Sequence, residues 1–363
     1  MKVLHVVGAR PNFMKVAPVL SALKRRPSFV QSLVHTGQHY DANMSDIFFE
    51  QLGIPVPDAN LKVGSGSHAR QTAEIMTRLE PTLLENDPDI VLVYGDVNST
   101  VAAALVCAKL GIRVGHVEAG LRSFDRTMPE EVNRLVTDQL ADFLFTPSED
   151  GDQNLLAEGI PPEKIFRVGN VMIDSLIRLL PAARKVKDEN LPDRFALVTL
   201  HRPANVDDAA TLKRILDSLL ALNRELKVVF PTHPRTRQRI ADSKLCSDQL
   251  LLLDPVPYLE FLAMEARATV VITDSGGIQE ETTYLGVPCL TMRDNTERPI
   301  TISMGTNVLV GSDRNKLTAE LSKALQGQWK RGTIPPLWDG KAGERIADII
   351  GAAIPKSRGF HAA

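Results

Sequence analysis

The chain has 363 residues, 44% of them hydrophobic, and a formal net charge of -2. This length exceeds what one hydrophobic core usually serves, so we expect two domains of ordinary size. The near-neutral charge leaves no basic excess that could follow a nucleic-acid backbone or an anionic membrane, so neither is expected as a partner. An anionic ligand must therefore be held by a local cluster of residues.

The sequence gives no sign of export or membrane insertion. No apolar run approaches the roughly 18 residues that span a bilayer. Met1–Val7 is a short apolar run ended by Gly8, without the length or cleavage pattern of a signal peptide. Cys107, Cys246 and Cys289 are few, odd in number and far apart, which argues against a disulfide framework. These features predict a cytoplasmic protein.

Short β-branched runs alternate with amphipathic segments, a pattern typical of parallel sheets in α/β domains. The first series of predicted strands is Lys2–Val7, Gln31–Thr36, Ile90–Tyr94, Arg113–Val117 and Asp142–Thr146. The second is Phe195–Leu200, Lys227–Thr232, Leu250–Leu253, Thr269–Thr273, Val287–Met292 and Asn307–Val310. We therefore predict two Rossmann-like parallel-sheet α/β domains that face a cleft.

The predicted domain boundary lies near Asn170. Residues 1–170 would form the N-terminal domain, completed by a C-terminal helix from residues 342–355, and residues 171–341 would form the second. The polar stretch Pro181–Pro192 predicts a surface excursion, and residues 356–363 predict a loose tail.

Polar and charged residues directly follow many of the predicted strands. In open α/β sheets, ligands bind beyond the carboxyl ends of the strands. The residues at these ends include Arg10, Gln38, His39, Asp96, Glu118, His201, Arg202, His233 and Asp274. Strand ends can be polar simply because they meet water, but so many charges after buried strands favour a shared ligand-binding cleft.

The run Asp274–Glu281 predicts an anion-binding site. It follows an apolar strand and opens a helical segment closed by Gly286 and Pro288. Its two glycines let the backbone approach a ligand, and the amides of a helix N-terminus favour phosphate oxygens. The alternative is an ordinary serine N-cap with glycines that only tighten the turn.

Arg10 and Lys15 flank a second turn between a strand and a helix. Two cations and free backbone amides there could neutralise a phosphate, although solvated charges at a loop would look the same. The Gly-x-x-x-x-Gly-Lys-Ser/Thr spacing is absent, as is Gly-x-Gly-x-x-Gly after the first strand. The sequence therefore argues against ATP and nicotinamide cofactors, and we expect no cofactor.

Three carboxylates stand out by their positions after strands or at the start of a helix, which can bring them together: Asp96, Glu118 and Glu130. On the helix predicted from Pro129, Glu130 and Arg134 are one turn apart and are expected to lie opposite the packing face. That packing face is predicted to consist of Val132, Leu135 and Val136. Alternatively, Glu130 and the adjacent Glu131 could be first-turn acids favoured by the helix dipole.

His201 and His233 each follow a strand of the second series. Neither has the spacing of a metal ligand, and His-Glu-x-x-His, paired cysteines and a calcium-binding loop are absent, so we expect no metal at the site. A histidine at a cleft edge can be an acid, a base or a donor to a diphosphate.

Together these motifs resemble the non-hydrolysing UDP-N-acetylglucosamine 2-epimerases, which have a glycosyltransferase-B-like fold. The resemblance covers nearly the whole chain. The matching pieces are Gly8-Ala9-Arg10-Pro11 with Lys15, Thr36-Gly37-Gln38-His39, Gly95-Asp96, His116 to Arg122, Pro129-Glu130-Glu131 with Asn133-Arg134, His201-Arg202, Asp274 to Glu281 and Arg293 to Pro299.

The resemblance implies a homodimer that converts UDP-N-acetylglucosamine to UDP-N-acetylmannosamine by eliminating and re-adding UDP, for surface polysaccharide synthesis. It implies that Asp96, Glu118 and Glu130 transfer protons and that His201 is important to activity. The substrate-binding residues it implies are Arg10, Lys15, Arg134, Arg202, His233, Ser275, Gly276, Gly277 and Glu281, the last four at the diphosphate and ribose of UDP.

The sequence departs from the family pattern at two positions. Ala204 stands where a carboxylate is expected after His201-Arg202. Asp41 stands where substrate-activated members carry glutamine, so we expect activation to be weak or absent even though Gln38, His39 and Arg70 could form a second site.

Three alternatives to this assignment stay open. Some relatives act on UDP-sugars with further acetamido or carboxyl groups. A UDP-sugar-dependent glycosyltransferase and a UDP-sugar-binding regulator without turnover could also have the same architecture.

Overall fold

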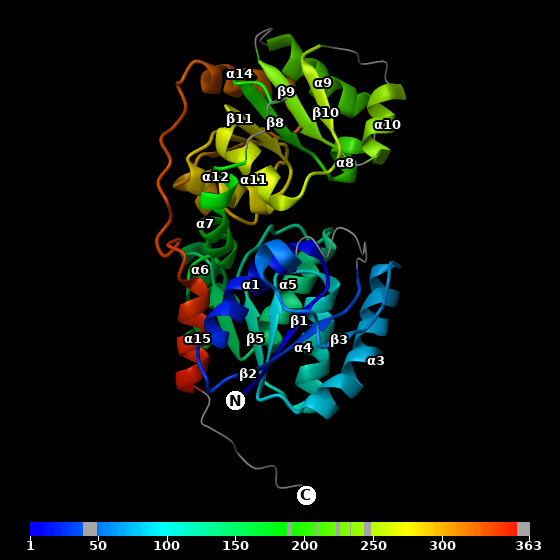
Figure 1. The fold of residues 1–363 in the computed structure, drawn as a ribbon, viewed down its shortest axis with the longest axis vertical. Coiled ribbons are helices and arrows are strands. Elements are labelled where there is room, and N and C mark those ends of the chain that lie inside the picture. The colour runs from blue at the N-terminus through cyan, green and yellow to red at the C-terminus, as the bar shows by residue number, and fades with distance from the viewer. Residues whose placement is uncertain are drawn as a thin grey trace, which may run out of the picture. The chain divides into compact units, whose positions relative to one another are not determined.

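The computed structural model describes residues 1–38, 49–186, 191–207, 209–222, 226–232, 234–242 and 248–353. The chain forms two compact units, Met1–Ser175 with Pro336–Ala363 and Leu176–Pro335. Each unit contains one parallel sheet surrounded by helices (Figure 1), which confirms the predicted α/β fold class. The predicted tail at residues 356–363 lies outside the described residues.

The first unit has a seven-stranded sheet in the order β3-β2-β1-β4-β5-β6-β7, with every neighbouring pair parallel. Its strands are β1 (Lys2–Val7), β2 (Val30–His35), β3 (Ala59–Asn60), β4 (Ile90–Tyr94), β5 (Val114–Val117), β6 (Phe143–Thr146) and β7 (Ile165–Arg167). The five predicted strands are present. The sequence did not predict β3 and β7, because these edge strands are only two and three residues long and carry no buried apolar run.

The second unit has a six-stranded parallel sheet in the order β10-β9-β8-β11-β12-β13. Its strands, all at predicted places, are β8 (Phe195–Thr199), β9 (Lys227–Pro231), β10 (Leu250–Leu253), β11 (Val270–Thr273), β12 (Cys289–Thr291) and β13 (Asn307–Leu309). Thr273 pairs with Thr199 on one side and with Thr291 on the other. Three neighbouring strands therefore end at the same level, and the residues that follow them are brought together.

Most α-helices of the described residues lie in the connections between strands, and the last two helices follow the last strand. The α-helices are α1 (Arg10–Lys24), α3 (His68–Asn86), α4 (Asn98–Leu110), α5 (Pro129–Leu140), α6 (Glu149–Ala157), α7 (Val171–Ala183), α8 (Pro203–Val206), α9 (Ala209–Leu222), α10 (Pro234–Asp242), α11 (Tyr258–Arg267), α12 (Gly276–Leu285), α13 (Ile300–Ser303), α14 (Arg314–Leu325) and α15 (Ala342–Ala353). The excursion predicted from Pro181 starts too early, because α7 continues to the buried Ala183.

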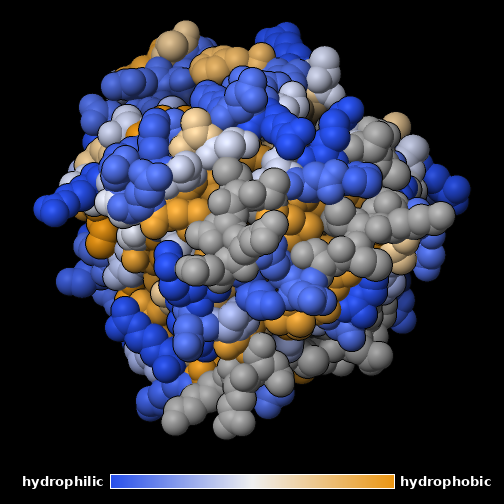
Figure 2. All heavy atoms as spheres, turned by 90° about the horizontal axis from the view of Figure 1, so that it is seen from above, coloured by the Kyte–Doolittle hydropathy of each residue, from blue (hydrophilic) through white to orange (hydrophobic). Residues whose placement is uncertain are grey.

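The surface is mainly polar. Figure 2 shows hydrophilic residues over much of one face, with apolar residues in small groups between them. Across the described ranges, each helix is too short or too polar to span a lipid bilayer.

The C-terminal segment of the first unit is held in place at several points. The indole Nε1 of the buried Trp338 donates to the carbonyl of Pro147 at 3.0 Å. Asp174 accepts the backbone N–H groups of Ala342 and Gly343, at 3.2 and 2.8 Å, at the start of α15. Helix α15 then lies alongside α1 (Figure 1), and a Cβ atom added at Gly343 would lie 2.7 Å from the carbonyl oxygen of Pro18.

We predict that Gly343→Ala destabilises the first unit, because the added methyl group overlaps the α1 backbone, which cannot move aside as a side chain could. Overpacking of this kind costs about 1–3 kcal/mol of unfolding free energy. Gly351→Ala is the matched control, since its Cβ would meet only Phe29, at 3.4 Å, and alanine favours a helix over glycine. Thermal and denaturant unfolding of both variants will test this; equal stability would show that α15 is not closely packed on α1.

Candidate functional site

Two predicted carboxylates lie at the carboxyl ends of neighbouring strands in the first unit. Asp96 follows β4 after Gly95, and Glu118 directly follows β5. Glu118 has a φ of 75°, in the left-handed region that residues other than glycine rarely adopt. Backbone strain of this kind persists where the surrounding structure enforces it and is common at functional sites.

Glu118 forms an ion pair with Lys15 of α1, and both residues are buried. Gly95 permits this pair, because a Cβ atom added there would lie 2.5 Å from Lys15 Nζ and 3.0 Å from Glu118 Oε2. Lys15 was predicted to bind substrate, and the structure shows it as the ion-pair partner of Glu118.

The sequence predicted backbone amides between β1 and α1 that are free to bind a phosphate, but the structure shows two of them in internal hydrogen bonds. The backbone N–H groups of Gly8 and Ala9 donate to Asn12 Oδ1 at 3.0 and 3.1 Å. Asn12 is buried and also donates to the carbonyl of Tyr94 at 2.8 Å. This part of the prediction is wrong, because the Asn12 side chain accepts the N–H groups of the turn. Arg10, beside this turn, is exposed.

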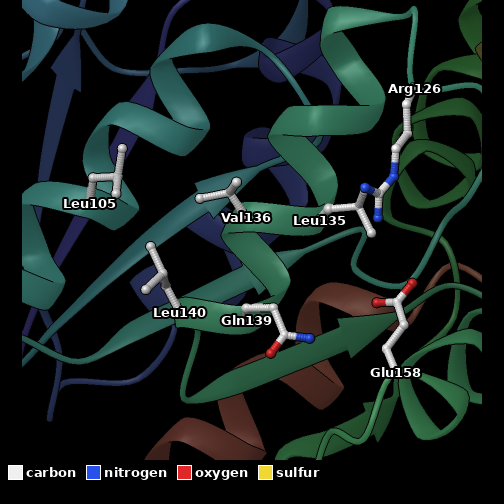
Figure 3. Close-up of a pocket in the computed structure, with 7 residues that line it drawn as sticks. All are labelled: Leu105, Arg126, Leu135, Val136, Gln139, Leu140 and Glu158. Carbon is white, nitrogen blue, oxygen red and sulfur yellow. The ribbon is translucent and has the colours of Figure 1, made fainter.

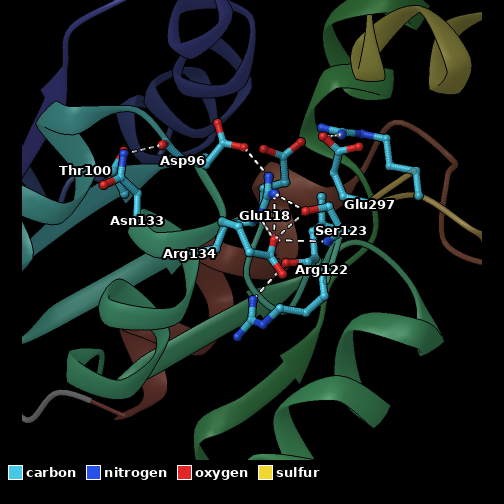
Figure 4. Close-up of polar contacts among 12 residues, drawn as sticks. Asp96, Thr100, Glu118, Arg122, Ser123, Asn133, Arg134 and Glu297 are labelled. Carbon is cyan, nitrogen blue, oxygen red and sulfur yellow. Dashed lines mark hydrogen bonds and ion pairs between the residues drawn. The ribbon is translucent and has the colours of Figure 1, made fainter. Parts of the chain in front are cut away.

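Arg134 of α5 lies at the centre of a second buried network (Figure 4). Its guanidinium forms an ion pair with Asp96 and donates twice to Glu131 Oε2, at 3.0 and 2.7 Å. Glu131 also accepts the backbone N–H groups of Ser123 and Phe124, at 3.0 and 2.9 Å. Burial by itself raises the pKa of Glu131, but these N–H donors and Arg134 lower the pKa below its ordinary value.

The predicted orientation of α5 is wrong. Its buried residues are Glu131, Asn133, Arg134, Thr137 and Asp138. The predicted packing residues face outward instead: Val132 is 45% exposed, and Leu135 and Val136 are half-buried. The polar side packs inward because its side chains are satisfied by the strand-end loops, as when Asn133 donates to the carbonyl of Asp96 at 2.8 Å.

His116 joins the two strand-end loops, a role that the sequence did not reveal. Its Nε2 donates to the Gly95 carbonyl at 2.8 Å, and its Nδ1 lies 2.6 Å from Asp138 Oδ1. Asp138 Oδ2 in turn accepts the N–H of Gly120 at 3.1 Å and pairs with Arg122 at 2.7 Å. The loops carrying Asp96 and Glu118 are therefore fixed to each other through the core.

A polar pocket of about 250 Å³ in the first unit collects several predicted residues. It is lined by Gln38, Ser65, Gly66, His68, Gln71, Asp96, Val97, Asn98, Glu130 and Asn133. Asp96 and Glu130 thus share one pocket with a histidine and several amides. Arg70 is exposed at the start of α3 and does not line it, and His39 and Asp41 lie outside the described residues.

In the second unit, Asp274 fixes the loop that carries His201 and Arg202. Its carboxylate accepts the backbone N–H of His201 at 3.0 and 3.1 Å, that of Arg202 at 2.9 Å, and Asn205 Nδ2 at 2.9 Å. The exposed His201 ring contacts Thr199 Oγ1 at 2.9 Å. His233 lies outside the described residues.

The predicted anion site lies at the N-terminus of α12, where Ser275, Gly276 and Gly277 are half-buried. The Ser275 side chain makes no capping hydrogen bond with α12, so the ordinary N-cap explanation fails. Gly276 leaves room for an arginine here, because a Cβ atom at this position would lie 2.3 Å from Arg298 Nη1. Arg298, which the sequence did not single out as a site residue, places a guanidinium at this turn and pairs with Glu280 at 3.0 Å.

Glu281, the remaining predicted residue of this segment, is 1% exposed and accepts the Tyr258 hydroxyl at 2.6 Å. Among the residues that the structure describes, no three His, Cys, Asp or Glu side chains converge as metal ligands would.

The sequence profile of the UDP-N-acetylglucosamine 2-epimerase family matches residues 21–351. A UDP-N-acetylglucosamine 2-epimerase of Methanocaldococcus jannaschii is 42% identical, with 96% of this chain and 99% of that protein covered. The UDP-2,3-diacetamido-2,3-dideoxy-D-glucuronate 2-epimerase of Pseudomonas aeruginosa is 43% identical over the same shares. The crystal structure of the M. jannaschii enzyme with UDP-GlcNAc and UDP superposes with a TM-score of 0.89 at 43% identity, covering 97% of this chain and all of the other.

We predict that Glu131→Gln destabilises the first unit far more than Glu130→Gln. Only Glu131 is buried against Arg134, and breaking a buried ion pair costs about 3–5 kcal/mol. Because the pKa of Glu131 is lowered on folding, its contribution is full at neutral pH and is lost as the pH falls below about 4. Unfolding measured at pH 7 and at a pH well below 4 will test this, and equal losses in the two variants at pH 7 would contradict it.

Proposed function

Because the chain belongs to the UDP-N-acetylglucosamine 2-epimerase family, we propose that it interconverts UDP-N-acetylglucosamine and UDP-N-acetylmannosamine. The observation that carries the proposal is the pair of cation-compensated carboxylates at the ends of β4 and β5, the half-buried Asp96 with Arg134 and the buried Glu118 with Lys15. Proton abstraction next to a sugar carbon needs a positioned base, and its reversal on the other face needs a positioned acid.

The proposed reaction has two balanced steps. A carboxylate removes the proton from C2, the electron pair of the C2–H bond forms the C1–C2 double bond, and UDP leaves with the electron pair of the C1–O bond. UDP oxygen then attacks C1 again, while a protonated carboxyl group delivers a proton to the opposite face of C2. Asp96, Glu118 and Glu130 are the proposed proton-transfer groups, and Glu130 shares a pocket with Asp96.

The second unit is proposed to hold the UDP that leaves and returns. The half-buried N-terminus of α12 offers amides to a diphosphate, and the resemblance assigns the diphosphate and ribose of UDP to Ser275, Gly276, Gly277 and Glu281 together. His201 and Arg202 stand on a loop that Asp274 fixes. A preorganised donor set aimed at a departing diphosphate lowers the barrier of such an elimination.

A modified UDP-acetamido sugar is the second candidate substrate. The relatives that act on UDP-N-acetylglucosamine and on UDP-2,3-diacetamido-2,3-dideoxy-D-glucuronate, by their names, are 42% and 43% identical to this chain. Identity therefore does not separate the two substrates, and both belong in the assay. Two further points stay predictions: that the product supplies surface polysaccharide synthesis, and that the protein is cytoplasmic.

Proton NMR of the protein with UDP-N-acetylglucosamine in heavy water tests the proposal. We expect the manno epimer to accumulate with deuterium at C2 and with the nucleotide still attached. Free sugar as the main product would indicate a hydrolase. Turnover only when a sugar acceptor is added would indicate a glycosyltransferase.

Matched variants belong in the same assay. Asp96→Asn, Glu118→Gln and Glu130→Gln should each lower turnover by at least ~100-fold, the lower range for a proton-transfer group. UDP binding should survive in all three, because these residues lie in the first unit. Full activity of any one variant would remove that residue from the mechanism.

We further propose that the outward face of α5 mediates a homodimer. Two hollows of about 500 and 490 Å³ adjoin this helix. The first is lined by Leu105, Arg126, Leu135, Val136, Gln139, Leu140 and Glu158 (Figure 3). The second includes Met76 and Val132. Apolar side chains grouped on an exposed helix face are typical of subunit interfaces.

Leu135→Glu should therefore convert a dimer to a monomer, because a charge cannot be buried in an apolar interface without a partner. Leu156→Glu is the control, since Leu156 of α6 is 51% exposed and outside this face. Light scattering after size exclusion gives the mass of each variant. A wild-type monomer, or a Leu135→Glu dimer, would contradict the proposal.

A further inference from the structure

His116 of β5 uses both of its ring nitrogens inside the first unit. Its Nε2 lies 2.8 Å from the carbonyl oxygen of Gly95, and its Nδ1 lies 2.6 Å from Asp138 Oδ1. The side chains of His116 and Asp138 are both fully buried. These two hydrogen bonds therefore determine which protons the ring carries.

The number of protons on the ring follows from what each partner can do. A carbonyl oxygen only accepts, so Nε2 carries a hydrogen. If Nδ1 carried none, its lone pair would point at the Asp138 carboxylate, whereas a protonated Nδ1 donates to it. Asp138 is ionised, because its other oxygen accepts the N–H of Gly120 at 3.1 Å and pairs with Arg122 at 2.7 Å. His116 therefore carries both ring protons, as an imidazolium.

The charges around this ring balance when it is protonated. Arg122, which pairs with Asp138, also donates to the two carboxylate oxygens of Glu158, at 2.7 Å each. The cations His116 and Arg122 then match the anions Asp138 and Glu158, whereas a neutral ring would leave one negative charge in excess. Burial by itself raises the pKa of Asp138, but His116 and Arg122 lower the pKa below its ordinary value.

Gly95, whose carbonyl His116 holds, lies next to both strand-end carboxylates. It directly precedes Asp96, and a Cβ atom added to it would lie 3.0 Å from Glu118 Oε2. An imidazolium bound to Gly95 therefore places a positive charge beside these two acids. A nearby positive charge favours the ionised form of a carboxylate, and only the ionised form can remove a proton.

We infer that His116 is a positioning residue of the proposed reaction: its imidazolium fixes the loop of Asp96 through the Gly95 carbonyl and favours the ionised form of the strand-end carboxylates. Lys15 and Arg134 pair with these acids directly, whereas His116 acts on them from within the sheet. The inference rests on the proposed function, because it assumes that a carboxylate removes the C2 proton.

Nitrogen NMR tests the charge of His116 without any measurement of activity. In protein with ¹⁵N-labelled histidine, the shifts of the two ring nitrogens distinguish an imidazolium from each neutral tautomer, and the signals are assigned through the backbone of residue 116. We expect both ring nitrogens of His116 to be protonated at pH 7.5. A ring with only one protonated nitrogen would overturn the inference. The wild-type protein suffices, so the test does not depend on whether a variant folds.

The pH dependence of epimerisation tests what the charge does. His116→Gln keeps a neutral donor but removes a positive charge, so the strand-end carboxylates ionise less readily. The acidic limb of the kcat/KM profile should therefore move to higher pH by about half a unit or more. The double variant His116→Gln/Asp138→Asn removes one charge of each sign and should return the limb toward its wild-type position.

His5→Gln is the matched control, because His5 is a buried histidine that lacks a charge. Its ring lies 2.7 Å from the Tyr94 hydroxyl and 3.1 Å from Gln31 Oε1, and burial lowers its pKa to about 3. Loss of this ring should leave the acidic limb in place, whatever it does to stability.

An unmoved limb in His116→Gln, or the same shift in the single and double variants, would overturn the role of the charge. The same shift in His5→Gln would also overturn it, because a neutral histidine would then have the same effect. A wild type without epimerase activity would contradict the proposed function instead, and the NMR experiment would still decide the charge of His116.

Discussion

The compensation of carboxylates at strand ends is the constraint on which the first unit depends. Asp96 is half-buried and Glu118 is buried, and both follow strands with buried side chains, where leaving a carboxylate unpaired costs stability. The compensating cations come from two helices, Lys15 from α1 and Arg134 from α5. Both helices must therefore dock correctly before the acids can be accommodated, so the fold and the site form together.

The orientation of α5 follows from the same constraint. Burying Glu131 and Arg134 satisfies the strand-end loops and leaves Val132 exposed on the other side. When the polar side of a helix is buried in the protein, its apolar side faces the surface. The exposed face is thus a consequence of the site and the basis of the proposed dimer.

In the second unit, the carboxylate that follows a strand is compensated without a cation. Asp274 is 2% exposed and is compensated by backbone N–H groups and an asparagine, which fixes the loop of His201. Charged side chains are instead concentrated at α12, where the guanidinium of Arg298 lies beside Gly276 and Glu281 is buried. Rigid loops and buried charges of this kind are what a diphosphate site requires for preorganisation.

The sequence by itself determined the two parallel-sheet domains, because buried parallel strands are continuous apolar runs, and it located the carboxylates and glycine-rich turns that follow them. It failed at β3 and β7, which are too short to carry such a run, and at α5, where apolar spacing pointed to the wrong face. Only the tertiary structure decided that Glu131 and Lys15 are partners of other site residues. Pairing between groups as distant in sequence as Lys15 and Glu118 depends on how helices dock onto the sheet, and no local pattern encodes that.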